Sequence, residues 1–266
     1  GVDVNFSKSR VQGEFVVQCT EGQDVETYQD FAYADCNTEA LRRKVRETLQ
    51  MTRDRAKAVT APPAGEYRVI LSGPYVRDIF SYYVDRSGSS MVYQKYSTFQ
   101  AGCDVQGGEA KKDRICLTLK ATVPYSGEGI PMRDRELVRD GELLLLHGGN
   151  RFAYYMNLEP TGNYGSFKAP EGKVPLEEMR RTPYLEVVNF SDFQMDSFTG
   201  HFGGEIRLAY LYDGKKRIPV TGGSINGNIL EAQKTLTFSS QMQVEESFEG
   251  PQAVCMERIA VAGSGE

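Results

Sequence analysis

The chain has 266 residues, of which 40% are hydrophobic and 25% charged, a composition typical of a globular protein with one large or two small domains. The formal net charge is −5, and no long run of one sign occurs, which argues against nucleic acid or an anionic membrane as a partner. No apolar run approaches the roughly 20 residues that a membrane helix needs.

The five cysteines are odd in number, widely spaced and without a Cys-x-x-Cys pair. This pattern favours reduced thiols and therefore a cytoplasmic location. Because the chain begins with Gly1 rather than Met, we expect its natural start to lie upstream, and a removed signal peptide remains an alternative.

The first 60 residues predict strands followed by a helix. Alternating residues at Val11, Glu14–Gln18 and Thr27–Tyr33 predict two or three antiparallel strands joined at Glu21–Asp24. The helix is predicted over Thr38–Ala58, with Asn37 or Thr38 as its N-cap and an apolar face that recurs every four residues: Leu41, Val45 and Leu49.

A buried strand, Tyr67–Ser72, then leads through Gly73-Pro74 into a second helix over Tyr75–Asp85. Proline fits the first helical turn because its missing N–H is not needed there. The apolar face of this helix is predicted to contain Val76, Ile79, Phe80 and Tyr83.

The middle of the chain carries weaker signals. Tyr93–Gln106 predicts a loop or a strand crossing, Arg114–Val123 an alternating strand, and Leu143–Leu146 a buried strand. Ser166–Gly172 is the most linker-like segment, and Leu176–Met179 predicts a short helix.

The region from Tyr184 to Leu236 predicts strands, turns and a glycine-rich crossing into a short helix. Asp213-Gly214 indicates a two-residue hairpin turn, and the glycines of Gly222–Asn228 allow close approach to neighbouring strands. Asn228 is a candidate N-cap for a helix over Ile229–Lys234, and Val254–Gly263 predicts a last strand.

Four short motifs in this region occur in the order found in one known family. They are Thr-Gly-x-Phe at Thr199–Phe202, the strand Ala209–Leu211, Pro-Val-x-Gly at Pro219–Gly222 and Ile-x-Gly-Asn at Ile225–Asn228. In this order the chain resembles the C-terminal domain of the TldD/PmbA family, which comprises metallopeptidases and their metal-free partner subunits and is also called modulator of DNA gyrase. The resemblance extends in order from about Glu14 to Gly263.

The fold that we expect is α+β, with a large, curved, mostly antiparallel sheet and a few packed helices. Residues 1–266 would form one TldD/PmbA C-terminal-like region, with leading strands and a helix at 1–60 and the main sheet domain at 61–266. The resemblance also implies that the family's N-terminal α/β domain is absent from this chain.

The resemblance implies a zinc helix at one position of the chain. Catalytic TldD-type members carry His-Glu-x-x-x-His there, where two imidazoles bind zinc and a carboxylate activates water. This chain has Ser81, Tyr82, Asp85 and Arg86 in that six-residue segment, and the cysteine ligand of the family is not carried over to Cys255. We therefore expect no catalytic residue, no metal ligand and no cofactor.

The remaining candidate groups have simpler interpretations. His147 and His201, the two histidines of the chain, are predicted to be polar turn residues, and the carboxylates Glu128, Asp134 and Glu136 to lie on the surface. Most aromatic residues are predicted to be core residues. Those near the second helix are candidates for lining a peptide groove: Tyr82, Tyr83, Tyr96 and Phe99.

The resemblance thus implies a metal-free subunit that pairs with a zinc-bearing subunit and helps to hold an unfolded peptide. We expect a homodimer or heterodimer with a TldD/PmbA-family subunit, and neither nucleic acid nor a membrane as a partner. Two alternatives stay open. In the first, the chain is part of an active metallopeptidase whose metal ligands lie outside this fragment. In the second, it is a stand-alone domain that binds a peptide or a small molecule.

Overall fold

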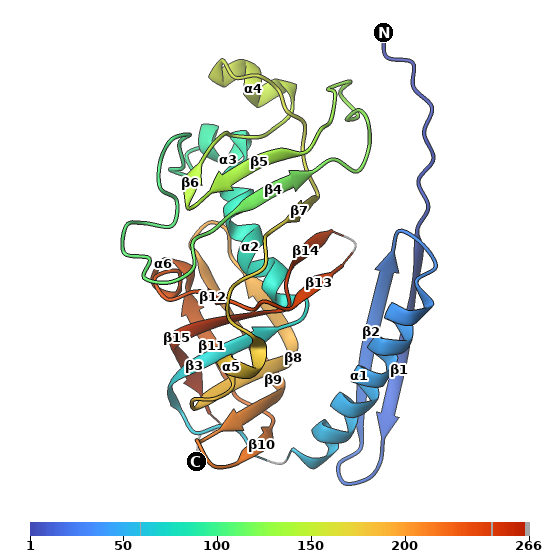
Figure 1. Ribbon diagram of the computed structural model, residues 1–266, viewed down its shortest axis with the longest axis vertical. Coiled ribbons are helices and arrows are strands. Elements are labelled where there is room, and N and C mark those ends of the chain that lie inside the picture. Colours follow the sequence, from blue (N-terminus) through green and yellow to red (C-terminus); the bar gives the residue numbers. More distant parts are fainter. Residues whose placement is uncertain (59, 246, 264–266) are drawn as a thin grey trace.

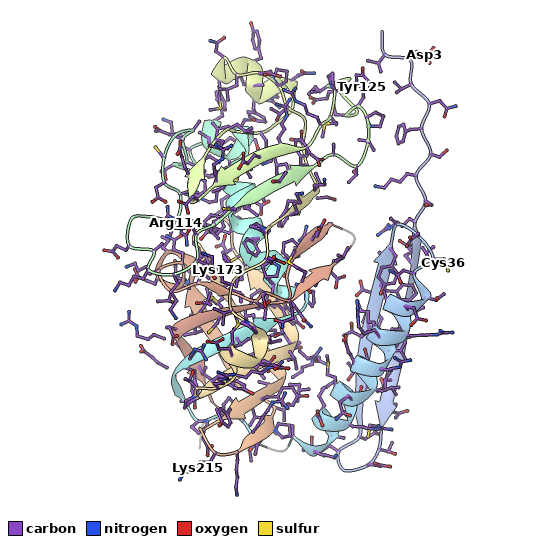
Figure 2. The ribbon with its side chains drawn as sticks, viewed as in Figure 1. Asp3, Cys36, Arg114, Tyr125, Lys173 and Lys215 are labelled. Atoms are coloured by element: carbon purple, nitrogen blue, oxygen red, sulfur yellow. The ribbon has the colours of Figure 1, made fainter. Side chains whose placement is uncertain are left out.

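The computed structural model describes residues 1–58, 60–245 and 247–263. An N-terminal arm lies beside the main body (Figure 1) and contains an antiparallel hairpin, β1 (Val11–Cys19) and β2 (Val25–Tyr33), followed by the helix α1 (Thr38–Lys57). These elements confirm the predicted strands and helix. Residues 1–10 precede the hairpin and are exposed, and Figure 2 labels Asp3 in this stretch.

Helix α1 begins at the predicted cap, because the Asn37 Oδ1 accepts a hydrogen bond from the Ala40 N–H at 3.0 Å. Its predicted apolar face was wrong: Leu49 is 40% exposed, and the buried residues are Thr48, Thr52 and Ala56. Small side chains on the buried face let the helix lie close to its neighbours. The spacing of the larger apolar residues does not show which face this is.

The first sheet has seven strands and forms the lower part of the body in Figure 1. The pairings run from β9 through β11, β15, β3 and β8 back to β9, so these strands close into a ring in which only β3 and β8 are parallel. The strands are β3 (Gly65–Ser72), β8 (Tyr184–Met195), β9 (His201–Tyr212), β10 (Arg217–Val220), β11 (Ser224–Asn228), β12 (Thr237–Phe238) and β15 (Ala253–Ala262).

The second sheet has six strands in the order β13-β14-β7-β4-β5-β6, and only β14 and β7 are parallel. The linker prediction for Ser166–Gly172 was wrong, since β7 lies inside this sheet and buries Phe167 against Phe248. The strands are β4 (Leu117–Lys120), β5 (Arg135–Arg139), β6 (Glu142–Leu143), β7 (Ser166–Lys168), β13 (Met242–Val244) and β14 (Phe248–Pro251).

Helix α2 (Tyr75–Arg86) runs between the two sheets (Figure 1), and the main hydrophobic core forms around it. The predicted apolar face is confirmed, because its four residues are at most 1% exposed. The remaining helices are short: α3 (Ser89–Tyr93), α4 (Asn150–Met156), α5 (Leu176–Met179) and α6 (Ile229–Ala232).

The backbone geometry tests two predictions made for the C-terminal strands. The turn after β9 spans residues 213–216, and only Gly214 there has a positive φ, so the two-residue turn was wrong. The glycine prediction is confirmed at Gly223, where φ is 74° and a Cβ would overlap the Ala262 carbonyl of β15. Asn228 also caps α6 as predicted, accepting from the Leu230 N–H at 2.9 Å.

The α+β prediction is confirmed, with strands that are mostly antiparallel but divided between the hairpin and two sheets rather than joined in one. In the part of the chain that the structure describes, no helix is long and apolar enough to cross a membrane.

Candidate functional site at helix α2

The C-terminal half of α2 carries the segment that the sequence places at the family's zinc helix. The Ser81 Oγ donates a hydrogen bond to the Asp78 carbonyl at 2.7 Å, within the helix. Tyr82 is 2% exposed and packs edge-on against Tyr83 and Phe99, with ring centroids 5.2 and 6.3 Å away.

Arg86 is 9% exposed, and its guanidinium contacts backbone and aromatic groups of neighbouring segments. Its guanidinium donates to the Tyr96 carbonyl at 2.8 Å and to the Phe198 carbonyl at 3.1 Å. It also lies over the rings of Tyr82 and Phe99, at 5.6 and 5.3 Å from their centroids. A fixed cation thus joins α2 to the segment after α3 and to the turn between β8 and β9.

These residues do not fit a zinc ion. A hydroxyl within the helix, a buried phenol and a guanidinium stand where two imidazoles and a carboxylate would be needed, and the guanidinium already supplies a positive charge. Burial raises the pKa of the Cys255 thiol to about 11, which disfavours the thiolate that zinc binds. Among residues 1–58, 60–245 and 247–263, no group of three His, Cys, Asp or Glu side chains could hold a metal ion.

The predicted groove aromatics divide into two environments. Tyr82, Tyr83 and Phe99 are buried around α2, whereas Tyr96 is 52% exposed and packs edge-on against Phe198. A peptide in this conformation of the protein can therefore reach only Tyr96 of the four.

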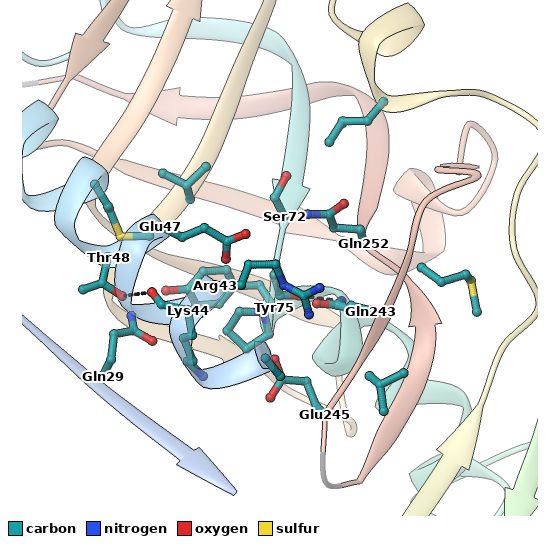
Figure 3. A pocket seen from close by; sticks show the side chains of 18 of the residues that line it. Gln29, Arg43, Lys44, Glu47, Thr48, Ser72, Tyr75, Gln243, Glu245 and Gln252 are labelled. Carbon is teal, nitrogen blue, oxygen red and sulfur yellow. Dashed lines mark hydrogen bonds between the residues drawn. The ribbon is translucent and has the colours of Figure 1, made fainter. Parts of the chain in front are cut away.

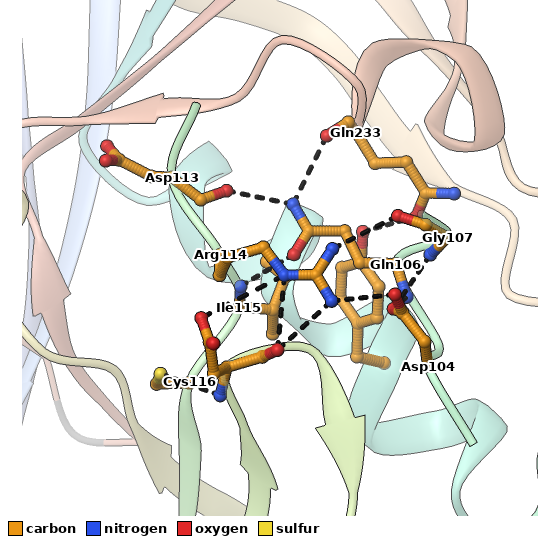
Figure 4. A network of polar contacts seen from close by, with 10 residues as sticks. Asp104, Gln106, Gly107, Asp113, Arg114, Ile115, Cys116 and Gln233 are labelled. Carbon is orange, nitrogen blue, oxygen red and sulfur yellow. Dashed lines mark hydrogen bonds and ion pairs between the residues drawn. The ribbon is translucent and has the colours of Figure 1, made fainter. Parts of the chain in front are cut away.

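Tyr83 ends in a buried polar network. Its hydroxyl donates to the Gln233 Oε1 at 2.9 Å, and burial raises the pKa of this phenol. Gln106 accepts from the Ile115 N–H at 2.8 Å and donates to the carbonyls of Asp113 and Gln233 (Figure 4). The network satisfies the polar groups of the loop before β4 and gives Tyr83 a structural role.

A cleft of about 590 Å³ opens at the other end of α2, between the N-terminal arm and the body (Figure 3). One wall is α1 with Arg43, Lys44 and Glu47, and the other contains the start of α2 and the strands β8 and β13. Because basic and acidic side chains both line it, the cleft has no strong preference for an anion or a cation.

Glu186 of β8 lies in this cleft wall and is 0% exposed. Arg180 donates to both of its carboxylate oxygens, with the Nε–Oε2 bond at 2.9 Å, and the Ser72 hydroxyl lies 3.1 Å from Oε1. Glu186 is not among the site residues predicted from the sequence. A single acid in the mostly apolar run at the start of β8, Tyr184–Val188, is the signal that points to a buried ion pair.

Strand β13 is the edge strand of the second sheet and borders the same cleft. The Glu245 N–H donates a hydrogen bond to the Phe248 carbonyl and therefore points toward the neighbouring strand. Because successive N–H groups in an antiparallel strand point alternately toward and away from the partner strand, the Val244 N–H points away from β14. Val244 is 69% exposed. An extended chain lying in the cleft therefore finds backbone groups that it can pair with.

The two histidines behave differently from each other. His201 is exposed at the start of β9, as predicted for a polar residue near a turn. The prediction for His147 was wrong, because it is 7% exposed, and its Nε2 lies 2.9 Å from the Val84 carbonyl at the end of α2. Burial lowers the pKa of its imidazole, which is therefore neutral at pH 7.

The predicted surface acids are found in surface contacts. Asp134 pairs with Lys120, Glu136 pairs with Arg139, and Glu128 accepts from the Asn150 N–H at 2.6 Å. None of them lies in the cleft beside α1.

Three solved structures share this fold at low sequence identity. A candidate modulator of DNA gyrase from Bacteroides thetaiotaomicron has a TM-score of 0.74 and 16% identity, covering 96% of this chain and 60% of its own. A second candidate modulator of DNA gyrase, from Thermotoga maritima, has a TM-score of 0.72 and 18% identity, covering 91% and 65%. TldE from Thermococcus kodakarensis has a TM-score of 0.75 and 16% identity, covering 96% and 62%.

The chain thus spans less than two thirds of the length of each of these relatives. No curated protein matches it in sequence. The family model for the C-terminal domain of PmbA/TldA metallopeptidases, in contrast, matches residues 64–263, which include both sheets and α2. The chain therefore belongs to the TldD/PmbA family and contains its C-terminal domain.

Proposed function

We propose that this chain is a TldD/PmbA subunit without catalytic zinc that holds unfolded peptides for a zinc-bearing subunit of the same family. One observation on α2 supports the proposal most strongly. Ser81, Tyr82 and Arg86 occupy the positions where the resemblance places the family's zinc-binding motif, and their side chains contact other parts of the protein instead. A chain of this kind contributes binding surface rather than chemistry.

The cleft beside α1 supports the peptide part of the proposal. Its volume of about 590 Å³, its mixed charge and the unpaired edge of β13 suit an extended polypeptide, whose backbone can add to a sheet whatever its sequence. Pairing through the backbone explains how one subunit would accept many unfolded substrates.

The partner and the compartment belong to the same proposal. We expect a dimer with a family subunit, as a heterodimer when the zinc-bearing partner is present and as a homodimer otherwise. The five cysteines are free in the described part of the chain, which supports a reducing compartment such as the cytoplasm.

The proposal predicts hydrolysis that depends on both subunits and on the β13 edge. A zinc-bearing family member should cleave a fluorogenic unfolded peptide several-fold faster with this chain than without it, and this chain alone should give no hydrolysis. Val244→Pro removes an outward N–H without touching the pairing with β14, so it should abolish most of the enhancement.

Val244→Thr is the matched control, since it keeps the N–H and the β-branched shape. Its enhancement should equal that of the unaltered chain. Hydrolysis by this chain alone that a chelator abolishes would contradict the claim that the chain lacks catalytic zinc. Equal enhancement by the proline and threonine variants would contradict the claim that the peptide pairs with β13.

A further inference from the structure

A second cavity lies at the C-terminal end of α2, separate from the cleft beside α1. It has a volume of about 510 Å³ and is lined by the end of α2, the start of α3, the turn between β8 and β9, and residues around His147 and Tyr164. Nothing in the proposed function requires it.

The charged groups of this lining are all carboxylates. Asp85 is exposed and accepts a hydrogen bond from the Ser197 hydroxyl at 2.7 Å. Asp196 is partly exposed and accepts from the Phe198 N–H at 2.8 Å, and its bond from the Thr199 hydroxyl holds the pKa of its carboxyl below the ordinary value. The described lining residues include no lysine or arginine.

His147 supplies an independent indication of a missing ligand. Its Nε2 faces the Val84 carbonyl, which can only accept, so the proton is on Nε2 and Nδ1 carries a lone pair. Nδ1 is buried and has no hydrogen-bond partner among the described residues. An acceptor that is buried and left unpaired is unfavourable, so a donor at this position would be favoured.

The remaining lining is apolar and aromatic. Met91, Met195 and the half-exposed Phe198 border the cavity, and the Tyr164 ring stands edge-on to the imidazole with centroids 6.2 Å apart. An aliphatic stem packs against such groups, and an aromatic face attracts a cation.

Arg86 lies behind this wall rather than in it. Its Nη1 donates to the carbonyls of Tyr96, Ser197 and Phe198, its Nε is buried without a partner among the described residues, and Arg86 is not a lining residue. The lining therefore contains two carboxylates and a histidine whose buried Nδ1 has no partner in the described part of the chain.

From these observations we propose that this cavity binds an alkylammonium group, with Asp85 and Asp196 as counter-charges and His147 as a hydrogen-bond acceptor. An ammonium offers three N–H donors and a positive charge on an aliphatic stem, which matches each part of the lining. A lysine side chain and the N-terminus of a peptide both carry this group.

The direct test titrates the protein with n-butylammonium and follows the imidazole signals of His147 by NMR, with the His201→Gln variant used for assignment. We expect a saturable shift with n-butylammonium and none with n-butanol, which has the same stem without the charge. Asp85→Asn and Asp196→Asn should each weaken binding about tenfold or more, since each removes a charge but keeps an oxygen that accepts the existing bonds.

Asp192→Asn is the matched control, because Asp192 is an exposed acid on β8 outside the cavity lining. It should bind n-butylammonium as the unaltered chain does. A shift that does not saturate, an equal response to n-butanol, or equal weakening by Asp192→Asn would overturn the site.

The source of the ammonium group is tested with three unstructured peptides, and this arm rests on the proposal that the chain binds peptides. One has an acetylated N-terminus and a lysine, one has norleucine in place of that lysine, and one has norleucine and a free N-terminus. Tighter binding of the first or the third over the second identifies the source.

The outcomes separate the two proposals. If n-butylammonium binds but no peptide does, the cavity stands and peptide binding fails. If all three peptides bind equally and n-butylammonium does not bind, peptide binding stands and the ammonium site fails.

Discussion

Arg180→Ala is expected to destabilise the protein by about 2–3 kcal/mol, because it leaves the buried Glu186 carboxylate without its main charged partner, while the 35% exposure of the Arg180 side chain weakens this ion pair relative to a fully buried one. Glu186 is 0% exposed and would lose both hydrogen bonds from the Arg180 guanidinium. The Ser72 hydroxyl and the Arg217 Nη2, 3.9 Å away, would be its remaining partners. Urea unfolding of the purified variant measures the loss.

Two further variants make this prediction specific. Arg181→Ala alters an exposed neighbour without a side-chain bond to Glu186 and should change stability by no more than about 0.5 kcal/mol. Replacing Arg180 and Glu186 together by leucine removes both charges and should restore much of the lost stability. Equal unfolding midpoints for Arg180→Ala and Arg181→Ala would show that the pair contributes little.

Arg86→Met is expected to cost about 3 kcal/mol and to loosen the turn between β8 and β9. The methionine keeps an apolar stem but leaves the carbonyls of Tyr96 and Phe198 without their charged donor and removes the cation from two aromatic faces. Thermal unfolding measures the loss of stability, and faster hydrogen exchange of the Phe198 and Gly200 amides measures the loosening.

Arg151→Met is the control for this prediction. Arg151 also lies over two rings, those of Phe152 and Tyr155, but it is exposed on α4. Its loss should cost less than about 1 kcal/mol. If the two variants are equally stable, Arg86 does not hold α2 to the neighbouring segments as its contacts indicate.

The sequence predicted elements best where local chemistry decides them. Asn37 and Asn228 both cap helices as their positions suggested. The second helix predicted after Gly73-Pro74 is present as α2, and the six residues that the resemblance assigns to the family's zinc helix lie within it.

Long-range packing defeated the same approach at other positions. Ser166–Gly172 contains glycine and proline and predicted a linker, yet Phe248 of β14, far along the chain, pairs with Phe167 of β7 there. His147 was predicted to be a polar turn residue because its burial depends on the end of α2, more than sixty residues earlier. Neither partner is visible in a local pattern.

The candidate sites depend on the same kind of long-range contact. Glu186 is paired by residues from β3, β10 and the segment after α5, and the cleft exists only because α1 lies beside β13. The cavity near His147 likewise combines four separate segments. Sequence motifs placed the chain in a family, but they do not bring these groups together.

The central claim, a family subunit without catalytic zinc, is tested most directly by elemental analysis of the purified protein before and after chelator treatment. A zinc-bearing family member purified in the same way serves as the positive control and should hold stoichiometric zinc that the chelator removes. Our account predicts zinc far below stoichiometry for this protein at both stages. Stoichiometric, chelator-removable zinc would contradict it and would require ligands other than Ser81, Tyr82 and Arg86.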